Sequence, residues 1–239
     1  VSQLKDITAR LEELTGKELD LDKLKETVRW SNRARVSYLK VHDLMKQKPC
    51  PWDGYTSCLF GISGSLFWGS PLRDDFHKEL IKEIEERIAT GKIYPEKHRV
   101  LWLPWVPVQP TNIFSILREN EVSIPVAEVT RVFWSEINED NPFEGLALKS
   151  LENPYVGSAD RRVRGIIKLA QDYSVDGAIH FSTPACRHEN GSIRLISDTL
   201  RARGLPLLNL DADMTDERYY FPAQTMERIH SFLEILRRR

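Results

Sequence analysis

The sequence has few cysteines and no paired-cysteine motif. Cys50, Cys58 and Cys186 are the only three, and no two of them form a CxxC pair. A sparse, odd number gives no disulfide framework, so we expect a reducing, cytoplasmic environment. Zinc is weakly supported for the same reason, because no second cysteine and no HxxxH pair near Cys186 would complete a tetrahedral site.

Other familiar signals are missing as well. No apolar run reaches the roughly 18 residues of a membrane-spanning helix. The formal net charge is only −1, with 34 Lys and Arg against 35 Asp and Glu, so we expect neither nucleic acid nor an anionic membrane as a partner. The absence of a P-loop, a GxGxxG and a GxSxG motif argues against a nucleotide site or a hydrolase in this chain.

The amino terminus begins without Met and already has a helical pattern. Its first residues, VSQLKDITARLEEL, are amphipathic and do not form a signal peptide. We therefore expect an internal fragment, with an amino-terminal domain upstream of it.

The first part of the chain is predicted to be helical. Residues 1–47 have apolar side chains at helical spacing, interrupted at Gly16. Residues 48–73 are rich in Pro, Gly, Ser and aromatic side chains, which indicates a loop or hinge. Another helix is predicted over about 74–90. We interpret residues 1–95 as a helical linker or interdomain region.

After about residue 95, short apolar runs alternate with amphipathic helical patterns. Because each predicted strand is almost wholly apolar, the alternation is typical of a parallel sheet covered on both faces. We therefore predict an α/β domain over 96–239, with an open, mostly parallel sheet of flavodoxin-like or Rossmann-like type and helices on both faces. The predicted strands lie in 99–108, 124–134, 175–181 and 205–211, and the predicted helices in 111–120, 141–151, 163–173, 191–203 and from about 223 onward.

Polar residues follow two of these strands. Ligands of open α/β sheets bind beyond the carboxyl ends of the strands. The stretches STPACRHEN, after 175–181, and DADMTDER, after 205–210, both fall at that edge. Functional side chains are therefore expected in these two loops.

Cys186 lies in the first of these loops and has several candidate roles. It is a buried inert thiol, a nucleophile or a metal ligand. A helix predicted to begin near Asn190 or Ser192 would favour its thiolate through the positive end of the helix. A Cys–His dyad with His188 is one alternative, although a surface or hydrogen-bonded histidine is the commoner case; His180 lies within the predicted strand and need not face the cysteine.

The acidic stretch after 205–211 also has two interpretations. Carboxylates that follow a strand can bind magnesium. They can equally form turns, helix caps and local ion pairs, and we favour this interpretation. The residues are Asp211, Asp213, Asp216 and Glu217.

Aromatic residues gather in the predicted hinge. They could line a pocket for an apolar acyl group. Packing between the two parts of the chain is the interpretation that we favour. The residues are Trp52, Tyr55, Phe60, Phe67 and Trp68.

The carboxyl-terminal half carries a more specific pattern. An apolar strand precedes Asp-x-Asp, x-x-Asp-x-Arg and Gln-x-x-x-Arg-x-x-x-Phe-x-Glu, matched by Asp211, Asp213, Asp216, Arg218, Gln224, Arg228, Phe232 and Glu234. On these residues, and on LEELTGKELDLDKLKETVRWSNRAR upstream, the chain resembles the D-component family of 2-hydroxyacyl-CoA dehydratases. That family includes 2-hydroxyglutaryl-CoA dehydratase and benzoyl-CoA reductase subunits. The likeness covers nearly the whole chain and is strongest over 160–239.

The resemblance implies an oxygen-sensitive subunit of a heterodimer that holds an iron–sulfur cluster. A separate ATP-hydrolysing iron–sulfur activator then supplies one electron. The dehydratases use it to form a ketyl radical from a 2-hydroxyacyl thioester, whose hydroxyl leaves. The implied activity is therefore that of a lyase on an acyl-CoA, with a 4Fe–4S cluster or, alternatively, a double cubane, and with 96–239 as the cluster- and substrate-binding domain.

The resemblance also suggests roles for individual residues. Cys186 matches the carboxyl-terminal cluster cysteine of the family, so cluster ligand becomes its favoured role. The other cluster cysteines of the family belong to the amino-terminal domain that we expect upstream, and Cys50 and Cys58 do not match them. Ser182, Arg187 and His188 are candidate substrate-pocket residues, and no catalytic residue is assigned.

Two alternatives remain at this point. One is a benzoyl-CoA reductase or double-cubane-type reductase subunit, which shares these motifs and differs in substrate. The other is a scaffold or partner subunit without a cluster, which the missing ligands would explain.

Overall fold

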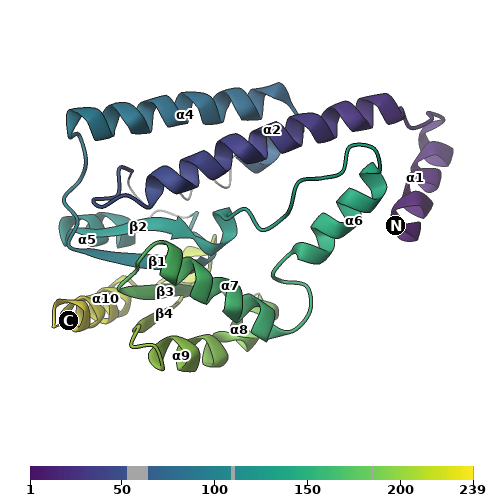
Figure 1. Ribbon diagram of the computed structural model, residues 1–239. Helices are drawn as coiled ribbons and strands as arrows, with labels where there is room; N and C mark the ends of the chain where they lie inside the picture. The colour runs from purple at the N-terminus through teal and green to yellow at the C-terminus, as the bar shows by residue number, and fades with distance from the viewer. Residues whose placement is uncertain (53–63, 109–110, 185, 239) are drawn as a thin grey trace. The chain divides into compact units, whose positions relative to one another are not determined.

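The computed structural model describes residues 1–52, 64–108, 111–184 and 186–238 (Figure 1). The described residues contain no helix that is both long enough and apolar enough to cross a membrane. In chain order the elements are α1 Ser2–Thr15, α2 Leu21–Met45, η1 Gly64–Phe67, α4 Pro71–Thr90, β1 His98–Pro104, α5 Ile113–Glu119, β2 Val122–Ala127, η2 Glu128–Thr130, α6 Pro142–Glu152, α7 Ala159–Asp172, β3 Gly177–Ser182, α8 Arg187–Gly191, α9 Ile193–Arg201, β4 Leu207–Asp211, η3 Glu217–Tyr219 and α10 Pro222–Arg237.

The strands form one sheet in the order β2-β1-β3-β4, and every pair is parallel. In the register of the sheet, Val100 of β1 lies opposite Gly177 of β3, and Ala178 lies opposite Leu207 of β4. The predicted fold class, an α/β chain with a parallel sheet and flanking helices, is confirmed. The strand predicted within 124–134 ends at Ala127, after which the short helix η2 begins.

Alternate side chains of the strands point to opposite faces of the sheet, and each face has its own helices. On one face Trp102, Ile179, Phe181 and Leu210 belong to a buried cluster that includes side chains of α5 and α10. On the other face lie α7 and α9, which contact each other (Figure 1). Both faces of each central strand are therefore buried, which explains why β1 and β3 are almost wholly apolar in sequence.

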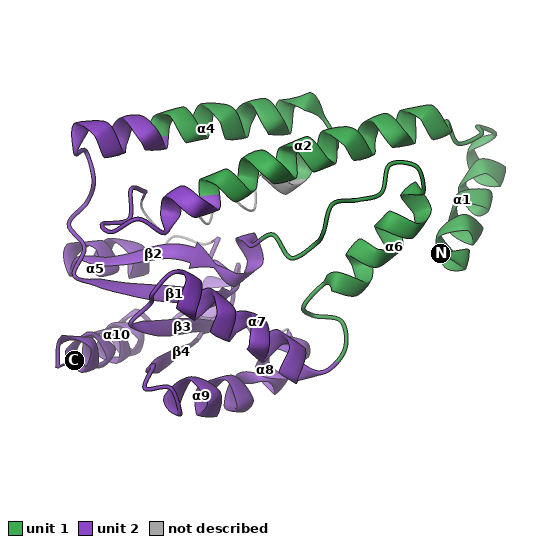
Figure 2. Cartoon of the chain, viewed as in Figure 1, with its two compact units in different colours: residues 1–41, 64–83, 132–157 green, residues 42–63, 84–131, 158–239 purple. Residues whose placement is uncertain are grey.

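The chain divides into two compact units, coloured separately in Figure 2. Residues 1–41, 64–83 and 132–157 form unit 1, and residues 42–63, 84–131 and 158–239 form unit 2. Unit 2 contains the whole sheet. The long helices α2 and α4 contribute residues to both units.

Unit 1 is held by contacts between α2 and the segment that precedes α6. The Asn32 side chain donates to the Ile137 carbonyl and accepts from the Ile137 amide, both at 2.9 Å. Arg35 donates to the carbonyl of Trp134 at 2.7 Å. Trp134 also packs edge-on against Trp68, with ring centroids 5.2 Å apart. An amide that satisfies both backbone groups of one partner fixes the register of two distant segments.

Part of the predicted hinge falls within the described residues. Trp68 packs inside unit 1, as described above, and Phe67 is exposed. The indole of Trp52, in unit 2, lies beneath the Arg87 guanidinium, 4.3 Å from the ring centroid. Tyr55, Cys58 and Phe60 lie outside the described residues. The following helix begins at Pro71, a few residues earlier than predicted, because proline suits the first turn of a helix.

Replacing Gly145 with alanine is expected to destabilise the protein. A Cβ at this position of α6 would lie 2.7 Å from an Ile137 methyl and 2.9 Å from the Asn138 amide nitrogen. Alanine normally stabilises a helix interior relative to glycine by about 0.5–1 kcal/mol. Here we expect a loss of about 1–3 kcal/mol in the free energy of unfolding, measured by urea denaturation, because the segment must shift.

Gly191→Ala is the matched control, because a Cβ at Gly191 of α8 meets no atom within 4 Å. This variant is expected to be neutral or slightly stabilising. An equal gain in stability from both variants would contradict the close approach of α6 to residues 137 and 138.

Candidate functional site

The strand order changes direction between β1 and β3. From β1 the chain adds β2 on one side, then crosses back to add β3 on the other side of β1 and β4 beyond it. The loops after β1 and β3 therefore lead away in opposite directions at the carboxyl edge, which is where open α/β sheets form a ligand crevice. Cys186 follows β3 in one of these two loops.

Hydrogen bonds join the loops at this edge. Thr183, after β3, donates from its hydroxyl to Asp213, after β4, at 3.2 Å. The Ala212 amide donates to the Ser182 carbonyl at 3.1 Å. In the loop after β1, the Val108 amide donates to the Met214 carbonyl at 2.9 Å. These hydrogen bonds connect the loops that follow β1, β3 and β4 at the carboxyl edge of the sheet.

Cys186 is a free, half-buried cysteine in a tight turn. Its amide donates to the Thr183 carbonyl at 3.1 Å, and its carbonyl accepts from the Asn190 amide at 3.1 Å. This second bond closes the first turn of α8, a short helix over Arg187–Gly191 that was not predicted. The helix predicted to begin near Asn190 or Ser192 is α9, which has Ser192 as its N-cap. Since α8 has only five residues, few peptide dipoles are aligned on the thiol.

Ser182 lies in a chain of polar side chains that runs across β3 and β4. The Ser182 hydroxyl donates to Asn209 Oδ1 at 2.8 Å, and the Asn209 amide donates to Asp211 at 2.7 Å. Arg228 of α10 donates to the other Asp211 oxygen at 3.0 Å. His180 Nδ1 lies 3.2 Å from the Ser182 hydroxyl. The Ser182 side chain is buried and already hydrogen-bonded, so it supports the edge from within.

The imidazole of His180 is fully buried beneath this chain. Burial lowers its pKa to about 4, and the positive charge of Arg162 acts in the same direction. His180 is therefore neutral at pH 7. Arg187 and His188, which follow Cys186 directly, are exposed on α8.

A buried charged group, here called the Arg162 cluster, lies where α8 meets α7. Its four members are Arg162, Glu128, Glu189 and Ser192, which are 1, 2, 3 and 4% exposed. The guanidinium of Arg162 donates to both oxygens of Glu128, at 2.9 and 2.8 Å. It also lies 2.6 Å from a Glu189 oxygen and donates to the Ser192 hydroxyl at 2.6 Å. One side chain of α7 thus joins η2, α8 and the start of α9.

The two carboxylates of the Arg162 cluster share one guanidinium. Burial raises the pKa of Glu189 to about 7; Arg162 opposes this shift and Glu128 adds to it. Glu189 is therefore close to half protonated at neutral pH. Buried carboxylates with raised pKa values are commonly found at functional sites, although ion-pair networks also produce them.

The sequence-based prediction missed this cluster. It placed Val163, Ile166, Ile167 and Ala170 on the inner face of α7. Val163, Ile166 and Ala170 are buried, as predicted, whereas Ile167 is only partly buried. Arg162 lies one turn before Ile166 on the same face. The available signal was that Arg162 lies on the apolar face of α7, where a charged side chain is unusual. Its partners Glu128 and Glu189 are distant in sequence, so they could not be paired with it from the sequence.

The acidic stretch after β4 forms turns. Asp213 accepts from the amides of Thr215 and Asp216, both at 2.9 Å, and these bonds lower its pKa. Asp216 caps η3 through the Arg218 amide and pairs with the Arg218 guanidinium, which lowers the pKa of Asp216 as well. The turn interpretation is confirmed by these bonds. Among the described residues, no three His, Cys, Asp or Glu side chains gather as metal ligands.

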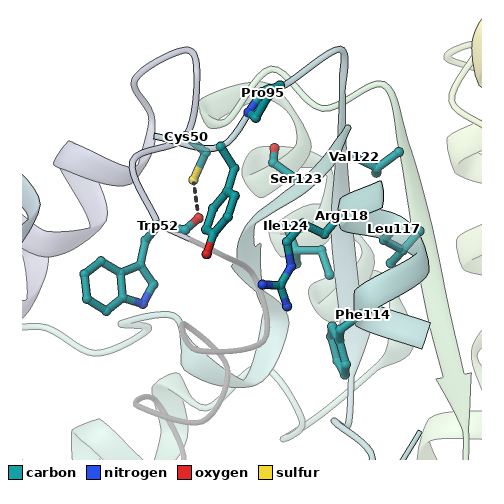
Figure 3. A pocket seen from close by; sticks show the side chains of 10 residues that line it. Cys50, Trp52, Pro95, Phe114, Leu117, Arg118, Val122, Ser123 and Ile124 are labelled. Atoms are coloured by element: carbon teal, nitrogen blue, oxygen red, sulfur yellow. Dashed lines mark hydrogen bonds between the residues drawn. The ribbon is translucent and has the colours of Figure 1, made fainter. Parts of the chain in front are cut away.

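Cys50 is buried at the opposite edge of the sheet. Its thiol donates to the Trp52 carbonyl at 3.4 Å and lines a pocket with Val122 and Ser123, at the start of β2 (Figure 3). Cys186 follows the carboxyl end of β3, and a six-residue strand is roughly 20 Å long. The two thiols therefore cannot bind the same metal cluster.

The described residues do not by themselves fit an iron–sulfur cluster. Such clusters are held by several cysteine thiolates. Within the described ranges the carboxyl edge offers one thiol, Cys186, and the nearby carboxylates of Asp213 and Asp216 are engaged in turns. The described part of this edge therefore supplies at most one of the ligands that a cluster needs.

Comparisons with known proteins point to one family. The family model described as "2-hydroxyglutaryl-CoA dehydratase, D-component" matches residues 1–236. The chain is 26% identical over 243 residues to the alpha subunit of (R)-2-hydroxyglutaryl-CoA dehydratase from Acidaminococcus fermentans, covering 98% of this chain and 50% of that protein. It is 24% identical to the (R)-phenyllactyl-CoA dehydratase alpha subunit of Clostridium sporogenes, with coverage of 98% and 58%. It is also 26% identical to a benzoyl-CoA reductase subunit of Thauera aromatica, with coverage of 99% and 59%.

The chain thus spans between half and three-fifths of the length of these relatives. The relatives include dehydratases and a reductase, all named as subunits. The match extends over both compact units of the chain.

Replacing Arg162 with methionine is expected to lower the free energy of unfolding at pH 7.5 by about 3–5 kcal/mol, because two buried carboxyl groups lose the guanidinium that they share. Urea denaturation measures this change. The triple variant Arg162→Met, Glu128→Gln, Glu189→Gln is expected to recover most of the loss, because it leaves no buried charge.

Arg164→Met is the matched control, since Arg164 is exposed on the same helix. It should change stability by less than about 0.5 kcal/mol. Equal losses in the two single variants would contradict the structural role of the Arg162 cluster.

Proposed function

Because the chain belongs to the 2-hydroxyglutaryl-CoA dehydratase D-component family, we propose that it is part of a 2-hydroxyacyl-CoA dehydratase subunit. The proposed reaction is the removal of water from a 2-hydroxyacyl thioester. Two of the relatives reported above are named as dehydratases of such thioesters, which supports this reaction class. Because the chain spans only part of its relatives, the activity belongs to the complete protein.

The position of Cys186 is the single observation that carries the proposal for this chain. Its half-buried thiol follows β3 at the switch point of the sheet, and its backbone is fixed by Thr183 and Asn190. We propose that Cys186 supplies one thiolate to an iron–sulfur cluster. The remaining ligands would come from residues outside this chain.

The chemistry of such a cluster is one-electron transfer, tuned by its ligands and surroundings. The part of this chain is to hold the thiol and shape the crevice. The bonds from Thr183 to Asp213 and from Val108 to Met214 keep the three edge loops together around that position. The radical route that the resemblance implies remains a proposal for the complete enzyme.

We propose that Arg187 and His188 contact the acyl-CoA substrate. Both are exposed beside Cys186, and a guanidinium suits the anionic groups of a coenzyme A thioester. The Ser182 hydroxyl is hydrogen-bonded inside the protein, which supports a role in positioning the loop and not in contacting substrate.

The proposed partners are a second enzyme subunit, an ATP-dependent iron–sulfur activator and an acyl-CoA substrate, in the cytoplasm. The subunit names of the relatives support the first of these. Neither nucleic acid nor a membrane is proposed as a partner.

A reductase is the second candidate function. The benzoyl-CoA reductase subunit is as similar to this chain as the alpha subunit of the hydroxyglutaryl enzyme, at 26% identity. Assays of the complete enzyme with a 2-hydroxyacyl-CoA and with an aryl-CoA distinguish the two activities: the proposed dehydratase releases water from the first and leaves the second unchanged.

Replacing Cys186 with serine in the complete subunit is expected to abolish iron retention. After anaerobic purification, the parent subunit should be brown and contain iron and acid-labile sulfide at about the stoichiometry of a cubane. The serine variant should lose most of both, because a hydroxyl is a poor substitute for a thiolate. Iron and sulfide analysis, with circular dichroism to verify the fold, measures this result.

Cys50→Ala is the matched control, because Cys50 lies at the opposite edge of the sheet, and this variant should keep its iron. Unchanged iron in the Cys186 variant would disprove the ligand assignment. A colourless parent subunit after anaerobic reconstitution with its partner would instead indicate a scaffold subunit without a cluster.

A further inference from the structure

The helix that follows Cys186 is anchored by the Arg162 cluster. Cys186 is the N-cap of α8, and Glu189 lies three residues later on the same helix. The Arg162 guanidinium contacts the Glu189 carboxyl at 2.6 Å and donates to the Ser192 hydroxyl at 2.6 Å, just after α8 ends. A helix of five residues is too short to be stable alone, so its position depends on such contacts.

The charges around Glu189 do not balance when its carboxyl is ionised. Arg162 of α7 is already bound through two hydrogen bonds to Glu128 of η2. From β3, His180 adds no positive charge, because its pKa is lowered to about 4 by burial. Arg162 is the cation that opposes the raised pKa of Glu189, and Glu128 adds to the shift. Arg131 lies against Gly165, further along α7, and Arg187 and His188 are exposed on α8 itself.

An ionised Glu189 therefore leaves two carboxylates on one guanidinium, away from water. Burying an incompletely compensated charge is unfavourable, and the carboxylate gains hydration if it moves to solvent. Glu189 reaches solvent when α8 moves away from α7, because the Arg162 side chain that holds its carboxyl lies on α7.

We propose that Glu189 and Arg162 are positioning residues for Cys186. Their contact holds α8 against α7 while the Glu189 carboxyl is neutral, and α8 is released when that carboxyl is charged. The release of α8 requires no metal and no partner. Its effect on a metal-bound Cys186 rests on the proposed function.

The direction of the pH dependence follows from the two states of α8. In a released helix Glu189 is solvated and titrates near its ordinary pKa of 4.5, whereas in the docked helix burial raises that pKa to about 7. The docked state binds the proton more tightly, so docking is strongest below pH 4.5 and weakens as the pH rises to 7. The opening equilibrium should increase about tenfold per pH unit in this range, about 300-fold in total, and level off above pH 7.

Hydrogen exchange of the full chain, without iron, tests the proposal between pH 5 and pH 8. The amides to follow are those of Asn190 and Ser192, which bond to the carbonyls of Cys186 and Glu189. After correction for the intrinsic exchange rate, their protection should fall about tenfold per pH unit up to pH 7 and then stay constant. In Glu189→Gln, which keeps the Arg162–Glu128 pair, their protection should not change with pH.

Two comparisons make the test specific. Glu119→Gln, at an exposed position of α5, should retain the parent profile. The amides of β3 should show no such fall. An equal fall in β3 would indicate global unfolding and overturn the positioning role.

A second measurement follows Cys186 directly. Alkylation of the Cys186 peptide is quantified by mass spectrometry, and the ratio of the parent rate to the Glu189→Gln rate should rise from pH 5 to pH 7. A ratio independent of pH, or a flat exchange profile in the parent, would overturn the proposal. Neither measurement involves iron. A negative result here would therefore not affect the assignment of Cys186 as a cluster ligand. If that assignment proved wrong, the expected exchange and alkylation profiles would be the same.

Discussion

The bond between the Arg162 guanidinium and the Glu128 carboxylate is the interaction on which the candidate site depends. It buries an arginine of α7 against the short helix that follows β2, and the same guanidinium then binds α8 through Glu189 and Ser192. The loop after β3 is thereby connected to η2, the short helix that follows the edge strand β2. A buried ion pair contributes little net stability compared with apolar packing, but breaking it is costly. Its effect here is to fix one arrangement of the loop that carries Cys186.

The sheet determines where that loop can act. Strands β1 and β3 are central and buried on both faces, so their side chains contribute to the core, and β3 ends in the polar residue Ser182 at its carboxyl end. The winding direction changes between β1 and β3, and open α/β sheets bind their ligands at such a switch point. Membership of a family of acyl-CoA dehydratase and reductase subunits is consistent with a ligand at this edge. Cys186, the one thiol at this edge among the residues that the structure describes, can supply one ligand of a cluster but not the whole set.

Much of the fold could be predicted from the sequence because its signals are local. The apolar runs of β1 and β3 and the amphipathic stripe of α7 indicate a parallel sheet, and the loop of Cys186 follows at the ligand edge. The helix predicted to begin near Asn190 or Ser192 is α9, capped by Ser192. The five-residue α8 before it was not predicted, because it is too short to show a helical period and a cysteine is not a usual N-cap residue. Arg162, Glu128 and Glu189 were not recognised as a group, since they are separated by 34 and 27 positions along the chain and only the fold brings them together. The division into two discontinuous units depends on the same long-range contacts.

Anomalous diffraction at the iron edge, from anaerobic crystals of the complete subunit, tests the central claim most directly. The account predicts an iron peak within bonding distance of Cys186 Sγ at the carboxyl edge of the sheet, and no iron near Cys50. A subunit that contains iron while the Cys186 thiol remains unbound would contradict it.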